Sequence, residues 1–508
     1  MAATQLAVQP EVAVQPRSVS RIARNVAFLA GGQLVTWCLS LLWTLFVPRA
    51  LGPRGLGELT VAYAVTGVIS VVVSLGIGTL MVKEIARDRA KASWLVGTAF
   101  LVRAGFVIPS LAALALYIRL VHFGGEQAIV IWLAAGSMVL ALFTGPLQAA
   151  FQAYERMEYL AYADVLTKAV VSVASIALVL MGFGVVAIMA LAVAMAAVVL
   201  ALNVWWSTGK FGVDWRTDRQ RIRFLVVDSL PYWTTGLVLT FYLWIDSVML
   251  SFLSSTEVVG WYAVPTKLFS TLLFVPVILG TAWLPRLSAA YREGPEEFRR
   301  TGRPALELVI VLGLPVAVGT ALVAGRAIHD IYGPAFAPSV IVMIILAASV
   351  PPTYMNIMFN QVLVASNRQI AWTKVMVSAA VINPVLNLVL IRYFQAQQHN
   401  GAIGAAVSLL ITEIAMAAVG LILIPRVFSR SSLRRLVSAA IATAGMAVAA
   451  VLAARFGLII EIAAGAVAFG VLAAALRLVT SDELAAVHPR LAAFPLGRVR
   501  PLKAADKT

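Results

Sequence analysis

The chain contains 508 residues, of which 61% are hydrophobic and 12% are charged, and its formal net charge is +16. An ordinary soluble domain is excluded, because about a quarter of the residues in such domains are charged. The single cysteine, Cys38, excludes an internal disulfide and a cysteine-based metal site. Four histidines lie far apart without ligand spacing, so neither a metal nor a cofactor is expected.

Fourteen apolar stretches follow one another along the chain, and each is long enough to cross a hydrocarbon core of about 30 Å as an α-helix. Lipid offers no partners to backbone polar groups, so helices are expected for these stretches. The sequence therefore predicts an all-α polytopic membrane protein with 14 transmembrane helices. The expected spans are 26–47, 59–81, 94–118, 128–149, 160–181, 185–206, 230–253, 261–284, 305–324, 339–364, 375–391, 403–424, 437–454 and 458–478.

Basic residues mark every second gap between the expected spans. Thirty of the 39 Lys and Arg residues fall on one side, six on the other and three inside spans. This bias identifies a cytoplasmic face, and it explains the positive charge without a nucleic-acid partner. We expect a multi-pass protein of the cell membrane, in contact with membrane lipids, with both termini in the cytoplasm. Residues 1–25 are expected to form an N-terminal tail, and residues 479–508 a basic tail.

The two halves of the chain repeat short motifs in the same order. Gly57-Glu58-Leu59 corresponds to Gly260-Trp261-Tyr262, and Ala153-Tyr154-Glu155-Arg156 corresponds to Ala365-Ser366-Asn367-Arg368. Two six-helix bundles related by a pseudo-two-fold axis along the membrane normal are therefore expected, a plan found in secondary transporters. The expected parts are an N-terminal bundle at 26–208, a cytoplasmic linker at 209–229, a C-terminal bundle at 230–425 and an additional helix pair at 436–478.

Several short motifs carry a family resemblance. They are Arg24-Asn25-Val26 with Gly31-Gly32, Leu51-Gly52-Pro53-Arg54-Gly55-Leu56-Gly57, Pro231, Asp246 and Val259-Gly260-Trp261-Tyr262-Ala263. With six plus six plus two spans, the chain resembles the multidrug/oligosaccharidyl-lipid/polysaccharide flippase superfamily, and within it the Wzx-type polysaccharide flippases. The resemblance implies translocation of a lipid-diphosphate-linked oligosaccharide from the inner to the outer leaflet by alternating access, for cell-surface polysaccharide biosynthesis. It leaves open whether a proton or sodium gradient, or a polysaccharide polymerase, takes part.

Three cations fall inside expected spans: Arg103, Lys168 and Lys267. An ionised group in a span is costly and usually faces a cavity or a partner. In a flippase these cations would bind the substrate diphosphate, for which a guanidinium offers bidentate contacts. The structural alternatives are an Arg103 tied to helix carbonyls and a Lys168 paired with Asp164 one turn away.

Acidic and amide side chains inside spans are the next candidates. Asp246 and Lys267 are expected at similar depth, where they form either a structural ion pair or an ion-coupling site. Glu413 has no charged neighbour within a turn, so it is either a hydrogen-bonded core acid or a proton-coupling site. Asn356 and Asn360 are candidates for contacts to sugar, the alternative being hydrogen bonds between helices.

Other function classes compete with the flippase. A cation-coupled multidrug exporter of the same superfamily would need an acidic cavity, against which the three buried bases argue. A membrane-embedded glycosyltransferase would need paired carboxylates on outer loops, and the short outer gaps contain none. No GxxxxGK[ST] loop is present, so direct coupling to ATP is not indicated. We therefore expect a transporter, not an enzyme; a non-transporting membrane scaffold is the remaining alternative.

Overall fold

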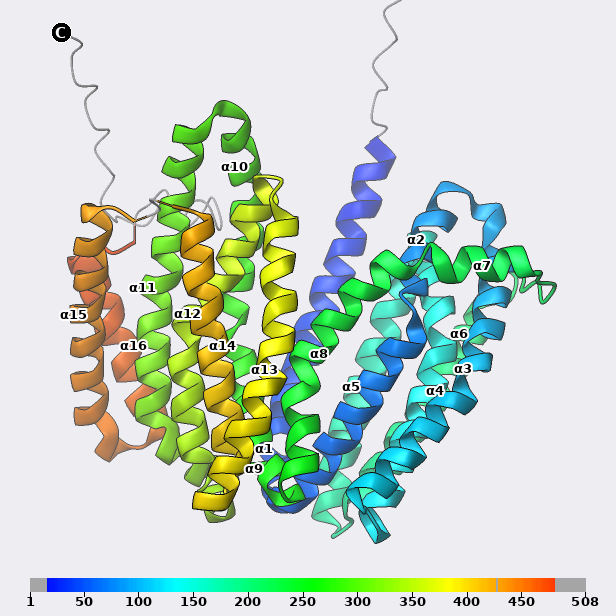
Figure 1. Ribbon diagram of the computed structural model, residues 1–508, viewed down its shortest axis with the longest axis horizontal. Helices are drawn as coiled ribbons and strands as arrows, with labels where there is room; N and C mark the ends of the chain where they lie inside the picture. Colours follow the sequence, from blue (N-terminus) through cyan, green and yellow to red (C-terminus); the bar gives the residue numbers. More distant parts are fainter. Residues whose placement is uncertain (1–15, 426–427, 480–508) are drawn as a thin grey trace, which may run out of the picture. The chain divides into compact units, whose positions relative to one another are not determined.

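The computed structural model describes residues 16–425 and 428–479, and these residues form helices and turns with no β-strand (Figure 1). Most of the two expected tails therefore lies outside the described residues. The all-α polytopic architecture predicted from the sequence is confirmed. The helices are α1 (Pro16–Ser74), α2 (Ile77–Arg87), α3 (Ala92–Val121), α4 (Gly125–Ala153), α5 (Met157–Leu180), α6 (Val185–Ser207), α7 (Arg219–Val227), α8 (Leu230–Leu253), α9 (Thr256–Leu272), α10 (Phe274–Glu293), α11 (Pro295–Ala327), α12 (Ser339–Ala365), α13 (Gln369–Gln398), α14 (Gly401–Leu423), α15 (Arg430–Ala453) and α16 (Leu458–Ala475).

Thirteen helical segments among the described residues are long and apolar enough to cross a membrane. Helix α1 has 59 residues, far more than one crossing needs, and it includes both the first expected span and most of the second. Its backbone leaves helical geometry at Gly52, where φ is 69°. A glycine tolerates this conformation without steric cost, so Gly52 forms the turn between the two spans.

The second expected span, 59–81, is wrong as one continuous helix. Helix α1 ends at Ser74, and both Leu75 (φ 49°) and Gly76 (φ 67°) adopt left-handed conformations before α2 begins. A Cβ on Gly76 would lie 2.5 Å from the backbone nitrogen of Trp233. The break therefore lets the start of α8 pack closely, and a run of apolar residues gives no signal of it.

The eighth expected span, 261–284, is also divided, between α9 and α10. Pro276 lacks the N–H that would bond the carbonyl of Leu272, four residues earlier. The hydroxyl of Tyr354 donates to that carbonyl instead, at 2.6 Å. The division is thus stabilised by a side chain from α12.

The chain divides into two compact units. Among the described residues, one contains 16–44, 69–115 and 132–235; the other contains 45–68, 116–131, 236–425 and 428–479. In the first unit, Met81, Leu95 and Phe151 belong to one buried core cluster. In the second unit, Trp283 and Phe359 belong to another. Each unit therefore has its own apolar core.

Helices α15 and α16, which correspond to the expected additional pair, pack against α11 within the second unit (Figure 1). Their contact contains Val311, Ala439, Ala442 and Ala473, all buried. Small residues let helix backbones approach closely in a membrane. The added pair is therefore docked on α11 by close packing.

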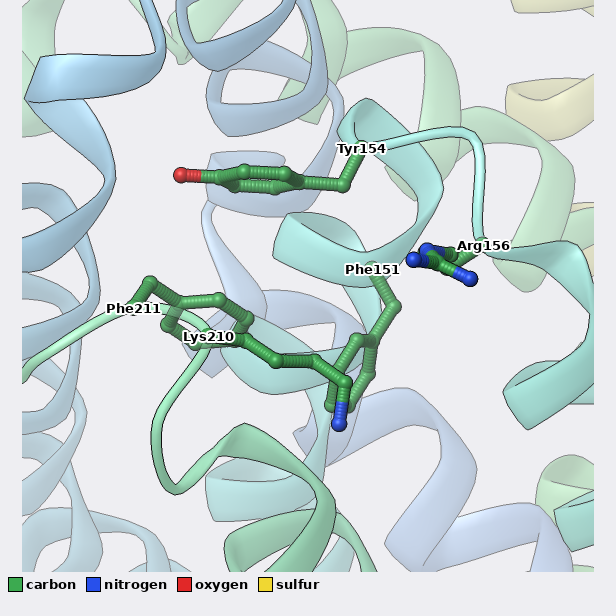
Figure 2. Close-up of a pocket in the computed structure, with 5 residues that line it drawn as sticks. All are labelled: Phe151, Tyr154, Arg156, Lys210 and Phe211. Carbon is green, nitrogen blue, oxygen red and sulfur yellow. The ribbon is translucent and has the colours of Figure 1, made fainter.

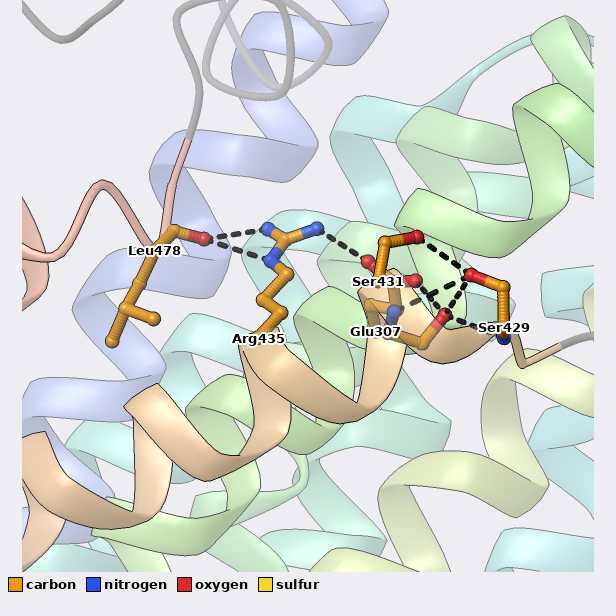
Figure 3. A network of polar contacts seen from close by, with 6 residues as sticks. Glu307, Ser429, Ser431, Arg435 and Leu478 are labelled. Atoms are coloured by element: carbon orange, nitrogen blue, oxygen red, sulfur yellow. Dashed lines mark hydrogen bonds and ion pairs between the residues drawn. The ribbon is translucent and has the colours of Figure 1, made fainter.

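Polar contacts fix both ends of this docking. Near the end of the helix pair where α15 begins, Arg435 Nη1 lies 2.9 Å from Glu307 Oε2, and Arg435 Nη2 donates to the carbonyl of Leu478 at 2.6 Å (Figure 3). Near its other end, Arg326 pairs with Glu461. Each carboxylate is mostly buried and has a cation, as buried charges require.

Candidate functional site

Two glycines meet at a helix crossing inside the second unit. A Cβ on Gly57 of α1 would overlap the carbonyl oxygen of Thr256, and a Cβ on Gly260 of α9 would overlap that of Pro53. The Gly57 Cβ would also lie 3.1 Å from the Gly260 nitrogen. Each glycine faces the carbonyl four residues before the other, so the crossing is symmetric. Only residues without a side chain permit this approach of two backbones.

Further contacts surround this crossing, all within the second unit. The hydroxyl of Tyr117 lies 2.7 Å from that of Ser251. Thr256 Oγ1 donates to Gln127 Oε1 at 2.9 Å, and Arg49 donates to the carbonyl of Asp330 at 2.8 Å. These residues lie toward the face that the charge pattern predicts to be external.

Arg103 of α3 is 4% exposed, and its Nη1 donates to the carbonyl of Leu142 in α4. That carbonyl is the acceptor left without its helical donor by Pro146, four residues later. Gly145 makes room, because a Cβ there would lie 2.6 Å from Arg103 Nη1. Arg103 therefore satisfies a carbonyl freed by proline, which favours the structural alternative. Its Nε has no partner in the described residues.

Asp246 of α8 lies in a buried polar cluster. Tyr262 of α9 donates to Asp246 Oδ2 at 2.7 Å, and Asn387 of α13 donates to Asp246 Oδ1 at 2.6 Å. Asn387 also donates to Asn383 Oδ1 at 3.0 Å, one turn earlier in α13. The amide oxygen of Asn387 is buried without a partner in the described residues. Two helices, α9 and α13, thus supply hydrogen-bond donors to one carboxylate of α8.

Glu413 of α14 is 1% exposed and lies in a second polar cluster of the same unit. It accepts hydrogen bonds from Tyr242 of α8 and from Asn356 Nδ2, the latter at 2.8 Å. Asn356 Nδ2 also donates to the Glu413 main-chain carbonyl at 3.0 Å. Asn356 therefore links α12 to α14, as the alternative of a hydrogen bond between helices expects.

The remaining candidates are less enclosed. The side chains of Lys168 in α5 and Lys267 in α9 are exposed, and Asn360 in α12 is half-buried. Lys168 and Asp164 form no ion pair among the described contacts, so the expected pairing one turn apart is not observed. The Asp246 carboxylate accepts hydrogen bonds from Tyr262 and Asn387, and both alternatives for Asp246 and Lys267 stay predictions.

No group of three or more His, Cys, Asp or Glu side chains that could hold a metal ion occurs among the described residues. The oxygens of Asp246, Asn383, Asn387 and Tyr262 are hard ligands of the kind that small cations prefer. Ion coupling at Asp246 stays a prediction. Sequence spacing did not indicate Tyr262 or Tyr242 as partners of the two acids, because each contact joins two different helices.

The comparisons with known proteins agree with this architecture. The model of a family described as "Polysaccharide biosynthesis protein" matches residues 22–291, just over half of the chain. No curated protein sequence matches. Several solved structures, by contrast, match more than four fifths of the chain.

Three solved structures share the fold. The lipid II flippase MurJ, in an inward closed conformation, has a TM-score of 0.68 at 14% identity, covering 87% of this chain and 98% of MurJ. An inward-facing multidrug resistance MATE family transporter of the MOP superfamily has a TM-score of 0.59 at 16% identity, covering 82% and 98%. A MOP superfamily transporter from Pyrococcus furiosus with a binding pocket of reversed polarity has a TM-score of 0.52 at 16% identity, covering 83% and 96%. The expected superfamily fold is confirmed.

Proposed function

The chain belongs to the polysaccharide biosynthesis protein family, and from this membership we propose that it is a flippase for a lipid-diphosphate-linked oligosaccharide. It would move the substrate from the inner to the outer leaflet by alternating access. The family places the chain in polysaccharide synthesis, and one structure with its fold is a lipid II flippase. We also propose that the chain belongs to the Wzx-type branch of these flippases.

The exposure of Lys168 and Lys267 within helices that cross the membrane is the observation that carries the proposal. A lysine that faces hydrocarbon is costly, so each side chain is expected to face an aqueous path or to reach an interface. An ammonium group in such a path attracts phosphate as a point charge. We therefore assign the diphosphate contacts of the transport path to these two lysines.

Arg103 is a weaker candidate for phosphate binding than the sequence suggested. Its Nη1 is committed to the Leu142 carbonyl, and its side chain is 4% exposed. Asn356 is likewise committed to Glu413. Asn360, which is half-buried, keeps its proposed role in contacting sugar. The proposed substrate contacts are thus Lys168, Lys267 and Asn360.

Ion coupling is proposed for the two buried acids of the second unit. Asp246 has oxygen neighbours on α9 and α13 that would accommodate a sodium ion, or a proton shared with Tyr262. Among the described contacts, the Glu413 carboxyl accepts hydrogen bonds from Tyr242 and Asn356, which suits a group that exchanges a proton. Exchange at either acid would change the contacts between α8 and its neighbours.

The second candidate is a cation-coupled multidrug exporter, which the shared fold of a MATE family transporter fits equally well. A cationic drug would need an acidic side chain that is accessible. Asp246 and Glu413 are 7% and 1% exposed and already hold hydrogen-bond donors. These two acids are thus closed to a drug, and the family membership favours the flippase.

Reconstitution in proteoliposomes separates the two candidates. A fluorescent lipid-diphosphate oligosaccharide in the liposomes and a fluorescent cationic dye in the lumen are followed in parallel, with protein-free liposomes as the control. Protein-dependent flipping without dye movement is the expected result. Dye movement without flipping would replace the flippase by the exporter.

The cellular setting is proposed on the charge pattern. The bias of basic residues assigns both termini to the cytoplasm of a cell that places the protein in its cytoplasmic membrane. A polysaccharide polymerase on the outer side is the partner that would consume the flipped substrate. Labelling of cysteines introduced at either terminus from one side of the membrane tests the orientation.

A further inference from the structure

A small cavity lies at one end of the first unit, between the α4–α5 turn and the residues that follow α6. Its volume is about 190 Å³, and its lining consists of Phe151, Tyr154, Arg156, Lys210 and Phe211 (Figure 2). Two of these side chains are cationic and none is acidic. The cavity is open to one side and lies where the charge pattern predicts the cytoplasmic membrane surface.

Aromatic rings form a firm wall for the cavity. Tyr154 and Phe211 are stacked with ring centroids 5.7 Å apart, and Phe151 meets Phe211 edge-on at 5.4 Å. The guanidinium carbon of Arg89 lies 5.2 Å from the centroid of the Tyr154 ring. The Tyr154 hydroxyl donates to the Arg89 carbonyl at 3.3 Å. These contacts fix the rings before any ligand arrives.

The two cations retain donors for a ligand. Lys210 Nζ donates to the carbonyl of Trp206 at 2.6 Å and lies 4.9 Å from the centroid of the Tyr159 ring. Arg156 Nη1 lies 3.2 Å from Glu158 Oε1, and the Arg156 side chain is 55% exposed. An ammonium has three donors and a guanidinium five, so each exceeds its observed partners. In Figure 2 both charged groups lie on the Phe151 side of the cavity.

The second half of the chain has the same turn without this arrangement. Glu155 and Asn367 have φ values of 59° and 56°. The next residues, Arg156 and Arg368, donate their N–H groups to the carbonyls five residues earlier, at 2.9 and 2.8 Å. The turns are thus equivalent, as the sequence repeat predicts.

The use of the arginine differs between these turns. Arg368 Nη1 donates to the carbonyl of Leu423 at 3.0 Å, at the end of α14. The corresponding carbonyl at the end of α6, that of Trp206, is bonded by Lys210 instead. The guanidinium of Arg156 is thereby released from closing the turn and lines the cavity. In the first half this arginine is therefore a second cation of the cavity, beside Lys210, whereas in the second half it caps α14.

We propose that this cavity binds a phosphate group, supplied by an anionic lipid headgroup of the adjoining leaflet. Charge-assisted hydrogen bonds from Arg156 and Lys210 match phosphate oxygens, and basic pockets among helices on the cytoplasmic side suit anionic headgroups. Aromatic rings favour the membrane interface, where the charge pattern predicts this cavity to lie. The headgroup would enter the cavity while its acyl chains stay in the bilayer.

Native mass spectrometry of the full chain in detergent tests this site. The protein is incubated with phosphatidylglycerol or with a diacylglycerol of the same acyl chains, which lacks the phosphate. We expect phosphatidylglycerol to be retained, and its retention to fall about tenfold in the double variant Arg156→Gln/Lys210→Gln. Diacylglycerol retention should be unchanged. Because Lys210 also caps α6, two single variants keep Lys210 unchanged. Arg156→Gln alone should lose part of the phosphatidylglycerol retention, and Arg156→Lys should recover it.

Arg368→Gln is the matched control, since it removes the equivalent arginine from the other half. Equal phosphatidylglycerol retention in the double variant, or an equal loss in Arg368→Gln, would overturn the site. Millimolar inorganic phosphate distinguishes the source. Displacement of the lipid at that concentration would assign the site to a soluble phosphate compound and refute the headgroup. The outcome does not depend on whether the protein flips a lipid-linked oligosaccharide.

Discussion

Gly57 and Gly260 occupy equivalent places on the two sides of one helix crossing. Each faces the main-chain carbonyl that lies four residues before the other, at Thr256 and Pro53. The same two glycines were aligned as repeated motifs in the sequence. The crossing therefore lies on the local symmetry axis of a duplicated segment, and it joins α1 to α9 on the predicted external side.

Adding one methyl group at this crossing should be costly. Gly57→Ala and Gly260→Ala are each expected to destabilise the protein by about 1–3 kcal/mol, because overpacking against a backbone cannot relax through a side chain. The double variant should cost less than the sum, since one separation of the helices relieves both overlaps. Thermal unfolding in detergent measures these changes.

Gly105→Ala provides the matched control, because a Cβ at Gly105 in α3 meets nothing within 4 Å. It should be neutral or stabilising by up to about 1 kcal/mol, as for an exposed helical glycine. Wild-type stability in both crossing variants would show that the backbones do not approach as described.

The effects of substitutions at Arg103 and Pro146 on stability should be coupled. Arg103→Gln is expected to destabilise the protein by about 1–3 kcal/mol, because it leaves the Leu142 carbonyl without its charged donor. Pro146→Ala restores the helical N–H to that carbonyl, so the same Arg103 substitution should then cost less. A double-mutant cycle from thermal unfolding tests this coupling.

A phosphate-binding role for Arg103 gives the opposite pattern. In that case Arg103→Gln would abolish flipping at unchanged stability, in the presence or absence of Pro146. Strict additivity of the two substitutions in stability would argue against the link between Arg103 and the proline.

The additional helix pair should depend on its ion pairs. Glu307→Gln leaves Arg435 without its carboxylate in a site where the two side chains are 9% and 16% exposed. Loss of one partner from a mostly buried pair costs roughly 3–5 kcal/mol. Limited proteolysis should therefore cut more readily between α14 and α15. Glu297→Gln, whose partner Arg300 is 78% exposed, should leave the cleavage rate unchanged.

Asp246→Asn should uncouple transport from an ion gradient. The substitution removes the negative charge, while the amide oxygen can still accept from one of the two donors, Tyr262 or Asn387. Flipping is then expected to become insensitive to an imposed sodium or proton gradient. The measurement compares initial rates with each gradient imposed or collapsed, and Glu413→Gln distinguishes which acid responds. Unchanged gradient dependence in both variants would refute coupling at these residues.

One pH effect is expected outside the membrane spans, at Glu84 of α2. The hydrogen bond from Lys91, at 2.9 Å, lowers the pKa of Glu84 below its ordinary value, and Arg87 adds to the effect. Because the folded pKa is lowered, this contribution to stability is present above the unfolded pKa and lost as pH falls through the folded value. Glu84→Gln should therefore lose part of the stability difference between pH 6 and about pH 4. If the stability of wild type and of Glu84→Gln changed equally with pH, this would contradict the contact between Glu84 and Lys91.

The helical type of the spans followed from apolar length, and the repeat followed from motif order, because both patterns are local in the chain. The break at Leu75 and Gly76 could not be predicted from the sequence, since it is imposed by the approach of α8. Apolar runs look alike on both sides of such a break.

The candidate site was predicted only in part. Arg103, Asp246 and Glu413 were identified because charges inside spans stand out. Their partners come from other helices: Leu142, Tyr262 and Tyr242 are contacts that no spacing reveals. One signal was available for Arg103, since the proline at 146 requires a substitute donor for the carbonyl four residues before it.

We propose above that exposed lysines inside the spans bind the diphosphate of a lipid-linked oligosaccharide during flipping. The most direct test of this proposal is the flipping rate of a fluorescent lipid-diphosphate oligosaccharide in proteoliposomes for Lys168→Gln/Lys267→Gln. Lys374→Gln, at an exposed lysine near the start of α13, is the control. We predict a rate at least about tenfold below wild type in the double variant, equivalent to one lost charged hydrogen bond, and a wild-type rate in the control. Equal flipping rates in wild type, the double variant and the control would show that Lys168 and Lys267 do not bind the diphosphate.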